Sequence, residues 1–171
     1  MLKINCGTRN IVIAALLIGA SILAPTAAAA DTGADTQDVQ HVLDAFHDAV
    51  YANDGKRLTS LFIPEGSSWV SVLTDDAFEK LKAKRPNISK IKVGSFQDFV
   101  KMVSAPNARL RPTRSNVIIQ SDGTIASVYF NYVFVIDGVA QNRGSETWQL
   151  VKGSDGWRIT AIAYSSTPTL N

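Results

Sequence analysis

Three Asp-Gly dipeptides, at residues 122–123, 137–138 and 155–156, divide the C-terminal part of the chain into four β-rich runs. Asp-Gly between such runs is a strong hairpin signal, because the tight turn needs positive φ angles that few other residues adopt. The spacing predicts a four-stranded antiparallel meander over about residues 109–120, 124–136, 139–152 and 157–165. One face of such a sheet must be buried, so the preceding residues have to supply its cover.

The residues before the meander show helical periodicity. Apolar side chains recur at helical spacing at Val39, Val42, Leu43, Phe46 and Val50, which predicts an amphipathic helix. We expect it to run from a Thr36 cap to about residue 53, with shorter helices near 56–62, 74–85 and 95–105 and a strand at 68–73. Helices followed by a meander predict the α+β class, with the helices packed on one side of the sheet.

Residues 1–30 are interpreted as a signal peptide. Lys3 and Arg9 precede an apolar run of 14 residues, and small residues follow it up to Ala30, a pattern that signal peptidase reads. A membrane span needs about 20 apolar residues, so an uncleaved anchor is the less favoured alternative. We therefore expect a secreted or periplasmic protein cleaved after Ala30, with no membrane association afterwards. A flexible lead-in is expected at 31–36, one domain at 37–166 and a tail at 167–171.

Charge and cysteine content restrict the partners. Removing the leader takes away two of the 17 basic residues, which leaves 15 basic and 15 acidic residues and gives no reason to expect nucleic acid. Cys6, the only cysteine, lies in the leader, so we expect neither a disulfide nor a cysteine-ligated metal. A cluster of Arg109, Arg111 and Arg114 has two interpretations, protection of an edge strand or capture of an anion at the mouth of a pocket.

Three stretches of the chain resemble the nuclear-transport-factor-2-like superfamily, which includes SnoaL-like and ketosteroid-isomerase-like proteins. They are YANDGKRLTSLF (residues 51–62), Trp69, and GSETWQLVKGSDGWRITAIAYSS (residues 144–166). The resemblance covers most of residues 37–166 and implies a cone-shaped α+β barrel, in which a curved antiparallel sheet wraps round N-terminal helices and often forms a pocket. It also implies a homodimer formed through the sheet. Such a fold hosts enzymes and non-catalytic modules alike.

The catalytic pattern of the ketosteroid isomerases is incomplete here. The resemblance places Phe46 where those enzymes have a tyrosine donor, and Trp69 or Val70 where they have the base. Only Glu146 could supply their acidic donor, and only with a shift in the alignment. His47, which could point inward from the first helix, is a second candidate base.

A ligand pocket is predicted from the register of the second hairpin. If residues 137–138 form a two-residue turn, Tyr129 pairs with Glu146, and Asn131 and Trp148 share their face. An apolar wall with a few polar groups is typical of a ligand site. The predicted ligand contacts are therefore Trp69, Tyr129, Asn131, Glu146 and Trp148. A one-residue bulge would exchange the two faces of the sheet.

These residues favour a domain that binds a small, partly apolar molecule or a protein partner without turning it over. The alternative is a SnoaL-like or isomerase- or lyase-type enzyme that uses Glu146 or His47 as general base. A third hypothesis is a structural association domain whose core is too full for a ligand. No cofactor and no metal site are expected. Burial of Glu146 in an apolar cavity would distinguish the hypotheses, because burial raises a carboxyl pKa and creates a usable base.

Overall fold

The computed structural model describes residues 32–106 and 109–169, so the predicted signal peptide, residues 1–30, lies outside the described part. The order of the elements is α1 (Thr32–Tyr51), α2 (Gly55–Thr59), β1 (Ser68–Leu73), α3 (Asp75–Lys84), β2 (Ile91–Gly94), α4 (Phe96–Val103), β3 (Thr113–Ser121), β4 (Ile125–Ile136), β5 (Val139–Gly153) and β6 (Gly156–Pro168). Helices precede the meander, as the α+β prediction requires.

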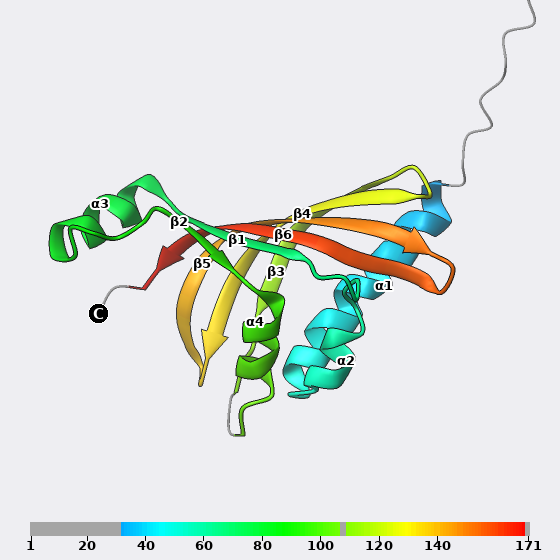
Figure 1. Cartoon of the computed structure of the whole chain (residues 1–171), viewed down its shortest axis with the longest axis horizontal. Coiled ribbons are helices and arrows are strands. Elements are labelled where there is room, and N and C mark those ends of the chain that lie inside the picture. The colour runs from blue at the N-terminus through cyan, green and yellow to red at the C-terminus, as the bar shows by residue number, and fades with distance from the viewer. Residues whose placement is uncertain (1–31, 107–108, 170–171) are drawn as a thin grey trace, which may run out of the picture.

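The strands form one curved sheet in the order β2-β1-β6-β5-β4-β3 (Figure 1). The predicted meander β3-β4-β5-β6 is confirmed, since each of these strands pairs antiparallel with the next. The sheet as a whole is mixed rather than antiparallel, because β1 lies parallel to β6. Strand β2 was not predicted; its four residues pair antiparallel with β1 and form one edge of the sheet.

The Asp-Gly turns have the backbone that their sequence demands. Asp137 and Gly138 both have positive φ, at 50° and 80°, which suits the two-residue turn between β4 and β5. Gly123 and Gly156 supply φ of 87° and 110° in the other two hairpins. The turns therefore join the strands in the predicted order.

Helix α1 lies along the concave side of the sheet and supplies much of the core (Figure 1). Four members of its predicted stripe are fully or almost fully buried, namely Val39, Leu43, Phe46 and Val50. The helix starts at Thr32, so most of the predicted flexible lead-in is helical. Thr36 does not cap the helix, because its hydroxyl donates to the carbonyl oxygen of Gly33 inside the first turns. At the other end of the chain, β6 extends to Pro168 and includes part of the predicted tail.

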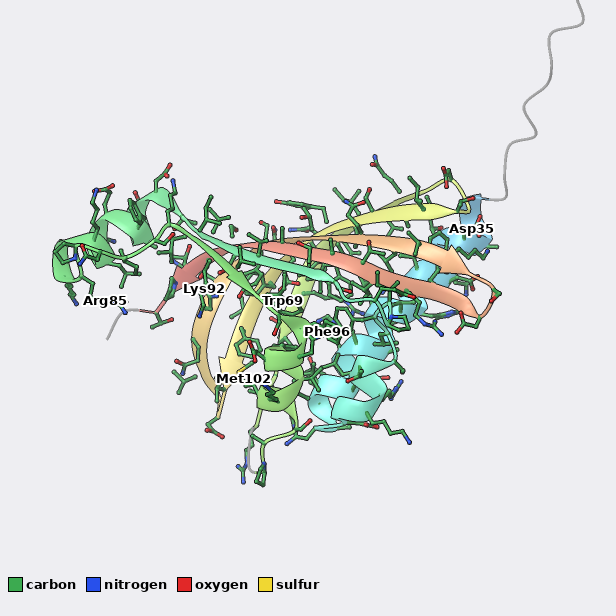
Figure 2. The ribbon with its side chains drawn as sticks, in the orientation of Figure 1. Asp35, Trp69, Arg85, Lys92, Phe96 and Met102 are labelled. Carbon is green, nitrogen blue, oxygen red and sulfur yellow. The ribbon has the colours of Figure 1, made fainter. Side chains whose placement is uncertain are left out.

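Two short helices shape the rest of the molecule. Helix α4 begins as predicted, with the Ser95 hydroxyl accepting from the backbone N–H of Asp98 at 3.1 Å. Helix α3 projects from the end of the sheet opposite α1, where Figure 2 shows Arg85 far from Asp35. Its buried residues, Ala77 and Leu81, attach it to the body. Within residues 32–106 and 109–169, no helix is long and apolar enough to cross a membrane.

Candidate functional site

A β-bulge decides which side chains face the interior. Ile136 pairs with Val139 as predicted, but the register shifts by one residue between Phe134 and Val135. Beyond this point Phe130 pairs with Glu146, and Tyr129 pairs with Thr147. The extra residue reverses the two faces over the rest of the hairpin. Glu146 and Trp148 therefore share their face with Phe130 and Tyr132 instead of Tyr129 and Asn131.

Tyr129 and Asn131 lie on the outer face of the sheet, so their predicted place in the pocket was wrong. The Tyr129 hydroxyl donates to the Ser145 hydroxyl at 2.9 Å, and Ser145 donates to Asn131 Oδ1 at 3.0 Å. Tyr129 keeps 42% of its surface exposed. The other three predicted contacts, Trp69, Glu146 and Trp148, line one interior cavity.

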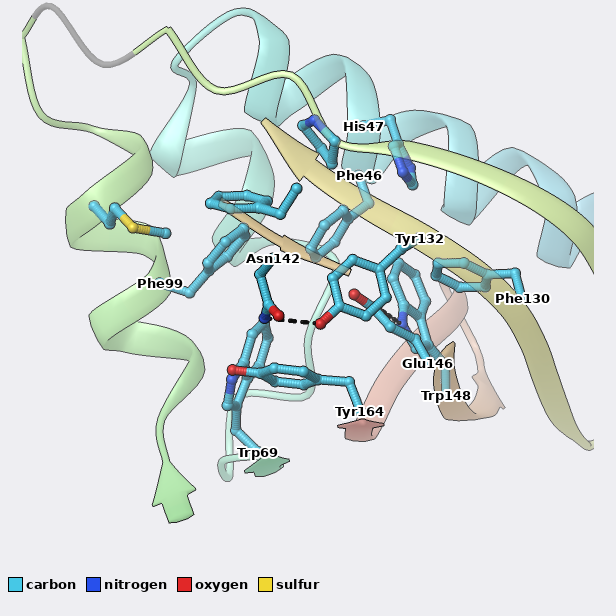
Figure 3. Close-up of a pocket in the computed structure, with 13 residues that line it drawn as sticks. Phe46, His47, Trp69, Phe99, Phe130, Tyr132, Asn142, Glu146, Trp148 and Tyr164 are labelled. Atoms are coloured by element: carbon cyan, nitrogen blue, oxygen red, sulfur yellow. Dashed lines mark hydrogen bonds between the residues drawn. The ribbon is translucent and has the colours of Figure 1, made fainter. Parts of the chain in front are cut away.

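This cavity has a volume of about 110 Å³ and lies between the concave side of the sheet and helices α1 and α4 (Figure 3). Most of its wall is aromatic. The lining residues are Phe46, His47, Trp69, Phe99, Met102, Pro112, Phe130, Tyr132, Phe134, Asn142, Glu146, Trp148 and Tyr164. The core is therefore not completely filled, although the space is smaller than the about 300–1,000 Å³ of common ligand pockets.

Among residues 32–106 and 109–169, Glu146 is the only carboxylic acid in the wall of this cavity. Its Oε2 accepts a hydrogen bond of 2.8 Å from Nε1 of Trp148, while no described residue donates to Oε1. Burial raises the pKa of Glu146 to about 7, and the Trp148 hydrogen bond opposes this rise only in part. Glu146 can therefore exchange a proton near neutral pH.

A second polar group in the cavity is held by the neighbouring strands. The Tyr132 hydroxyl donates to the carbonyl oxygen of Ser165 and accepts from Nδ2 of Asn142, both at 2.9 Å. Burial is the main cause that raises the pKa of Tyr132, and the electrostatic interaction with Glu146 adds to it. The phenol is therefore neutral at physiological pH. With its proton directed at Ser165, it offers a ligand an acceptor more readily than a donor.

Near Ser145 and Ser165, strands β5 and β6 depart from regular backbone pairing. Ser145 donates its backbone N–H to the Ser165 hydroxyl at 2.9 Å, where a regular ladder would use a backbone carbonyl. Gly144 lies so close that a Cβ atom there would be 2.1 Å from the Ser165 carbonyl oxygen. A glycine at 144 is thus required to bring the carbonyl that orients Tyr132 against β5.

His47 lies in the wall of the cavity, but its environment does not suit a general base. Its Nδ1 lies 2.7 Å from Nη1 of Arg114, which also donates to the Leu43 carbonyl oxygen at 3.0 Å. The same Nδ1 also lies 2.9 Å from the Leu43 carbonyl oxygen, so it accepts from Arg114 in one tautomer and donates to Leu43 in the other. Burial, aided by the charge of Arg114, lowers the pKa of His47. The imidazole is neutral and one of its nitrogens is already occupied.

Two members of the predicted arginine cluster serve to hold helix α1. Arg114 pairs with Asp44 in addition to its contacts with Leu43 and His47. Nη1 of Arg111 donates to the carbonyl oxygens of Leu110 at 2.7 Å and Tyr51 at 3.3 Å. These side chains fix α1 against the start of β3, whereas no side-chain contact of Arg109 with the described residues is seen. Among the described residues, no group of three His, Cys, Asp or Glu side chains is placed to hold a metal.

Several cavity residues were not predicted, chiefly Tyr132, Asn142 and Tyr164. The assumed register placed Tyr132 on the outer face, together with Phe130 and Phe134. One signal favoured the opposite choice, since the alternate positions 130, 132 and 134 are all aromatic, whereas positions 129, 131, 133 and 135 include Asn131. An aromatic stripe is the better candidate for the buried face of a sheet.

Comparison with known proteins identifies the fold of this chain. No protein-family model matches the chain, and no curated protein matches it. Solved structures do match. A nuclear-transport-factor-2-like protein of unknown function from Shewanella baltica is 15% identical with a TM-score of 0.57, over 80% of this chain and 97% of that chain. The chain has the nuclear-transport-factor-2-like fold.

Two further proteins with this fold carry a provisional enzyme name. A protein from Streptomyces avermitilis, named provisionally as a dehydratase of this family, is 18% identical with a TM-score of 0.58, over 81% of this chain and 99% of that chain. A protein from Novosphingobium aromaticivorans, named provisionally as a scytalone dehydratase, is 13% identical with a TM-score of 0.58, over 78% and 85%. At this identity the likeness concerns the fold alone, and function has to be argued from the site.

Proposed function

We propose that the protein binds a small, partly apolar molecule in the cavity between the sheet and helices α1 and α4. The observation that carries this proposal is the unfilled aromatic space around a single carboxyl group, with Oε1 of Glu146 left without a partner. This carboxylate oxygen lines the cavity, where water or a ligand can hydrogen-bond to it. A guest that fills the cavity and bonds to Oε1 would stabilise the folded state.

Nuclear magnetic resonance with phenol as probe tests this proposal. Phenol combines one apolar ring with one hydroxyl, so it should enter the cavity and shift the indole N–H signal of Trp148. Trp157 is an internal control, because it is also buried but does not line the cavity. Equal shifts at both indoles, or no shift at saturating phenol, would contradict the proposal.

A second candidate function is proton transfer on the bound molecule, as in a lyase or isomerase. A carboxyl pKa of about 7 for Glu146 favours it, because a general base works best when its pKa lies near the working pH. The provisional dehydratase names of the two proteins above point to the same class of reaction. If a substrate of this class is found, Glu146→Gln should reduce kcat by at least about 100-fold. The pH profile of the wild type should rise through about pH 7.

We also propose that the protein acts after export. The apolar run and the small residues of the first 30 positions support this. The intact mass of the protein, recovered after expression with its own leader, should correspond to a chain that starts at Asp31. A mass that still includes residues 1–30 would favour a retained anchor.

A further inference from the structure

The cavity combines many aromatic rings with one negative group. Eight of its 13 lining residues are Phe, Tyr or Trp, Glu146 is the only acid, and no Lys or Arg of the described chain lines it. Aromatic faces carry a partial negative potential and attract cations. The potential in the cavity is therefore negative when Glu146 is ionised, with no protein cation in the wall to balance it.

Three rings form a corner beside this carboxyl group. The ring of Tyr164 is nearly perpendicular to those of Tyr132 and Trp69, with interplanar angles of 88° and 75° and centroid distances of 6.0 and 6.2 Å. Figure 3 shows Tyr164 lying beneath the upright ring of Tyr132, with Trp69 to one side. Tyr164 is also the cross-strand partner of Glu146. The corner and the carboxylate thus face the same space.

Resting on the proposed small-molecule function, we propose that this cavity binds a small organic ammonium cation. The rings of Trp69, Tyr132 and Tyr164 act as an aromatic cage, and the carboxylate of Glu146 is the counter-ion. Cages of this composition are the common solution for recognising methylated ammonium groups. An anionic guest is disfavoured, because Glu146 would repel it and no cation of the wall would compensate.

The size of the cavity agrees with such a guest. A dry apolar cavity of roughly 150 Å³ accommodates a benzene molecule, and the present cavity measures about 110 Å³. Tetramethylammonium is close to benzene in bulk, so a single trimethylammonium head group is about the largest guest that the cavity holds. A neighbouring hollow shares Trp69, Phe99, Met102 and Tyr164 with the cavity. This open side leaves room for one substituent on the nitrogen.

The titratable groups around the cavity set the pH dependence of binding. Besides Glu146 they are Tyr132 on β4, Tyr164 on β6 and His47 on α1. Tyr132 stays neutral because its pKa is raised, and His47 stays neutral because its pKa is lowered. Cation binding is therefore tightest when Glu146, whose pKa is about 7, is ionised. If uncharged Glu146 keeps about a tenth of the affinity, the affinity should increase about fivefold from pH 6 to pH 8.

Calorimetric titration of the full chain with two probes of nearly the same shape tests the proposal. Choline carries the cation, and 3,3-dimethylbutan-1-ol has a carbon atom in place of the nitrogen. At pH 8 choline should bind at least about tenfold more tightly than the alcohol. Only choline should lose affinity at pH 6. If the alcohol binds as well as choline, or better, the ammonium proposal is wrong while binding of a small apolar molecule stands. If neither probe binds, the cavity proposal fails as well.

Variants at two positions test the charge of Glu146 and the aromatic ring of Tyr164 separately. Glu146→Gln should weaken choline about tenfold and leave the alcohol within about twofold. Tyr164→Phe keeps the ring face and should leave choline binding within about twofold, whereas Tyr164→Leu should reduce it at least about fivefold. Choline affinity that is unchanged in Glu146→Gln would overturn the role of the carboxylate. The two-probe comparison on the wild type needs no variant, so it decides the question even if Tyr164→Leu does not fold.

Discussion

At the scale of single residues, the cavity depends on two residues, Glu146 and Gly144, whose environments few other side chains would tolerate. Glu146 is placed among aromatic rings with one of its oxygens unpartnered. Gly144 allows a carbonyl group to approach where no other residue would fit. Both features reduce stability or restrict the sequence, and residues of this kind concentrate at functional sites.

Glu146 should make the protein less stable as the pH rises. Its pKa is about 7 in the folded protein and 4.5 for the free group, so the folded state binds the proton more tightly. Stability from this group is complete below pH 4.5 and is lost as the pH rises through about 7, by at most about 3 kcal/mol. Urea unfolding of wild type and Glu146→Gln between pH 4 and pH 8 should show a difference that changes by this amount. Glu65→Gln, at an exposed position, is the control and should follow the wild type.

Gly144→Ala should destabilise the protein by at least about 2 kcal/mol, because overpacking against backbone cannot relax through a rotamer change. The added methyl group would be 2.1 Å from the Ser165 carbonyl oxygen and 2.7 Å from its hydroxyl. Gly153→Ala is the matched control in the same strand. A Cβ atom at this position would be 3.3 Å from its nearest neighbour, Oδ1 of the Asp155 side chain. Thermal unfolding of both variants gives the comparison. Equal losses would mean that the close approach at 144 is not specific.

At the scale of elements, the position of α1 over the sheet is fixed by Arg111, just before β3, and by Arg114, near the start of β3. Arg114 reaches the Leu43 carbonyl, His47 and Asp44 with one guanidinium group, which is partly buried. This network differs from the exposed ion pair of Arg57 and Asp48, in which Nη2 and Oδ2 are 3.6 Å apart. Exposed pairs contribute little, whereas removing one partner of a buried network leaves the others unsatisfied.

Arg114→Met should therefore reduce the free energy of unfolding by about 1–3 kcal/mol. It should also raise the pKa of His47, because a nearby positive charge that lowers this pKa is removed. A nuclear magnetic resonance titration of the His47 ring signals measures the second effect. Arg57→Met is the control for an arginine paired with α1, and neither quantity should change much in it. An unchanged His47 titration in Arg114→Met would contradict the assigned contact.

At the scale of the whole molecule, the two faces of the sheet differ in their exposure to solvent. The concave face is covered by α1 and α4, while the outer face carries exposed apolar side chains on the meander, including Ile118, Ile125 and Tyr129. Ile118 and Tyr129 are cross-strand partners, so they form one continuous patch. The homodimer implied by the family resemblance remains a prediction, and this patch is the surface on which it can be tested.

Ile118→Lys should convert such a dimer into a monomer, because it places a charge at the centre of an apolar contact. Light scattering coupled to size-exclusion chromatography measures the mass of each species. Ile91→Lys introduces the same charge on β2, at the opposite edge of the sheet, where the wild-type side chain is equally exposed. A wild type that is monomeric at all concentrations would show the prediction to be wrong.

The sequence alone was enough to predict the class of fold, the four-stranded meander and its turns. It also predicted the buried stripe of α1 and the start of α4. These features depend on local chemistry, since turn residues and the period of apolar side chains act within a few positions. The sequence also indicated Glu146, Trp148 and Trp69 as cavity residues. It placed the start of α1 too late and did not reveal β2, because a strand of four exposed residues acquires its pairing only from β1.

Only the tertiary structure decided which residues surround Glu146. One bulge, with Gln141 of β5 as the extra residue opposite the step from Phe134 to Val135, exchanged Tyr129 and Asn131 for Tyr132 and Phe130. Nothing in the local sequence specifies that single extra residue, because the curvature of the sheet and the packing against α1 determine where the ladder must shift. The occupation of His47 by Arg114 likewise joins residues 67 positions apart. The carboxyl group is a property of the sequence, whereas its aromatic cage and its raised pKa are properties of the fold.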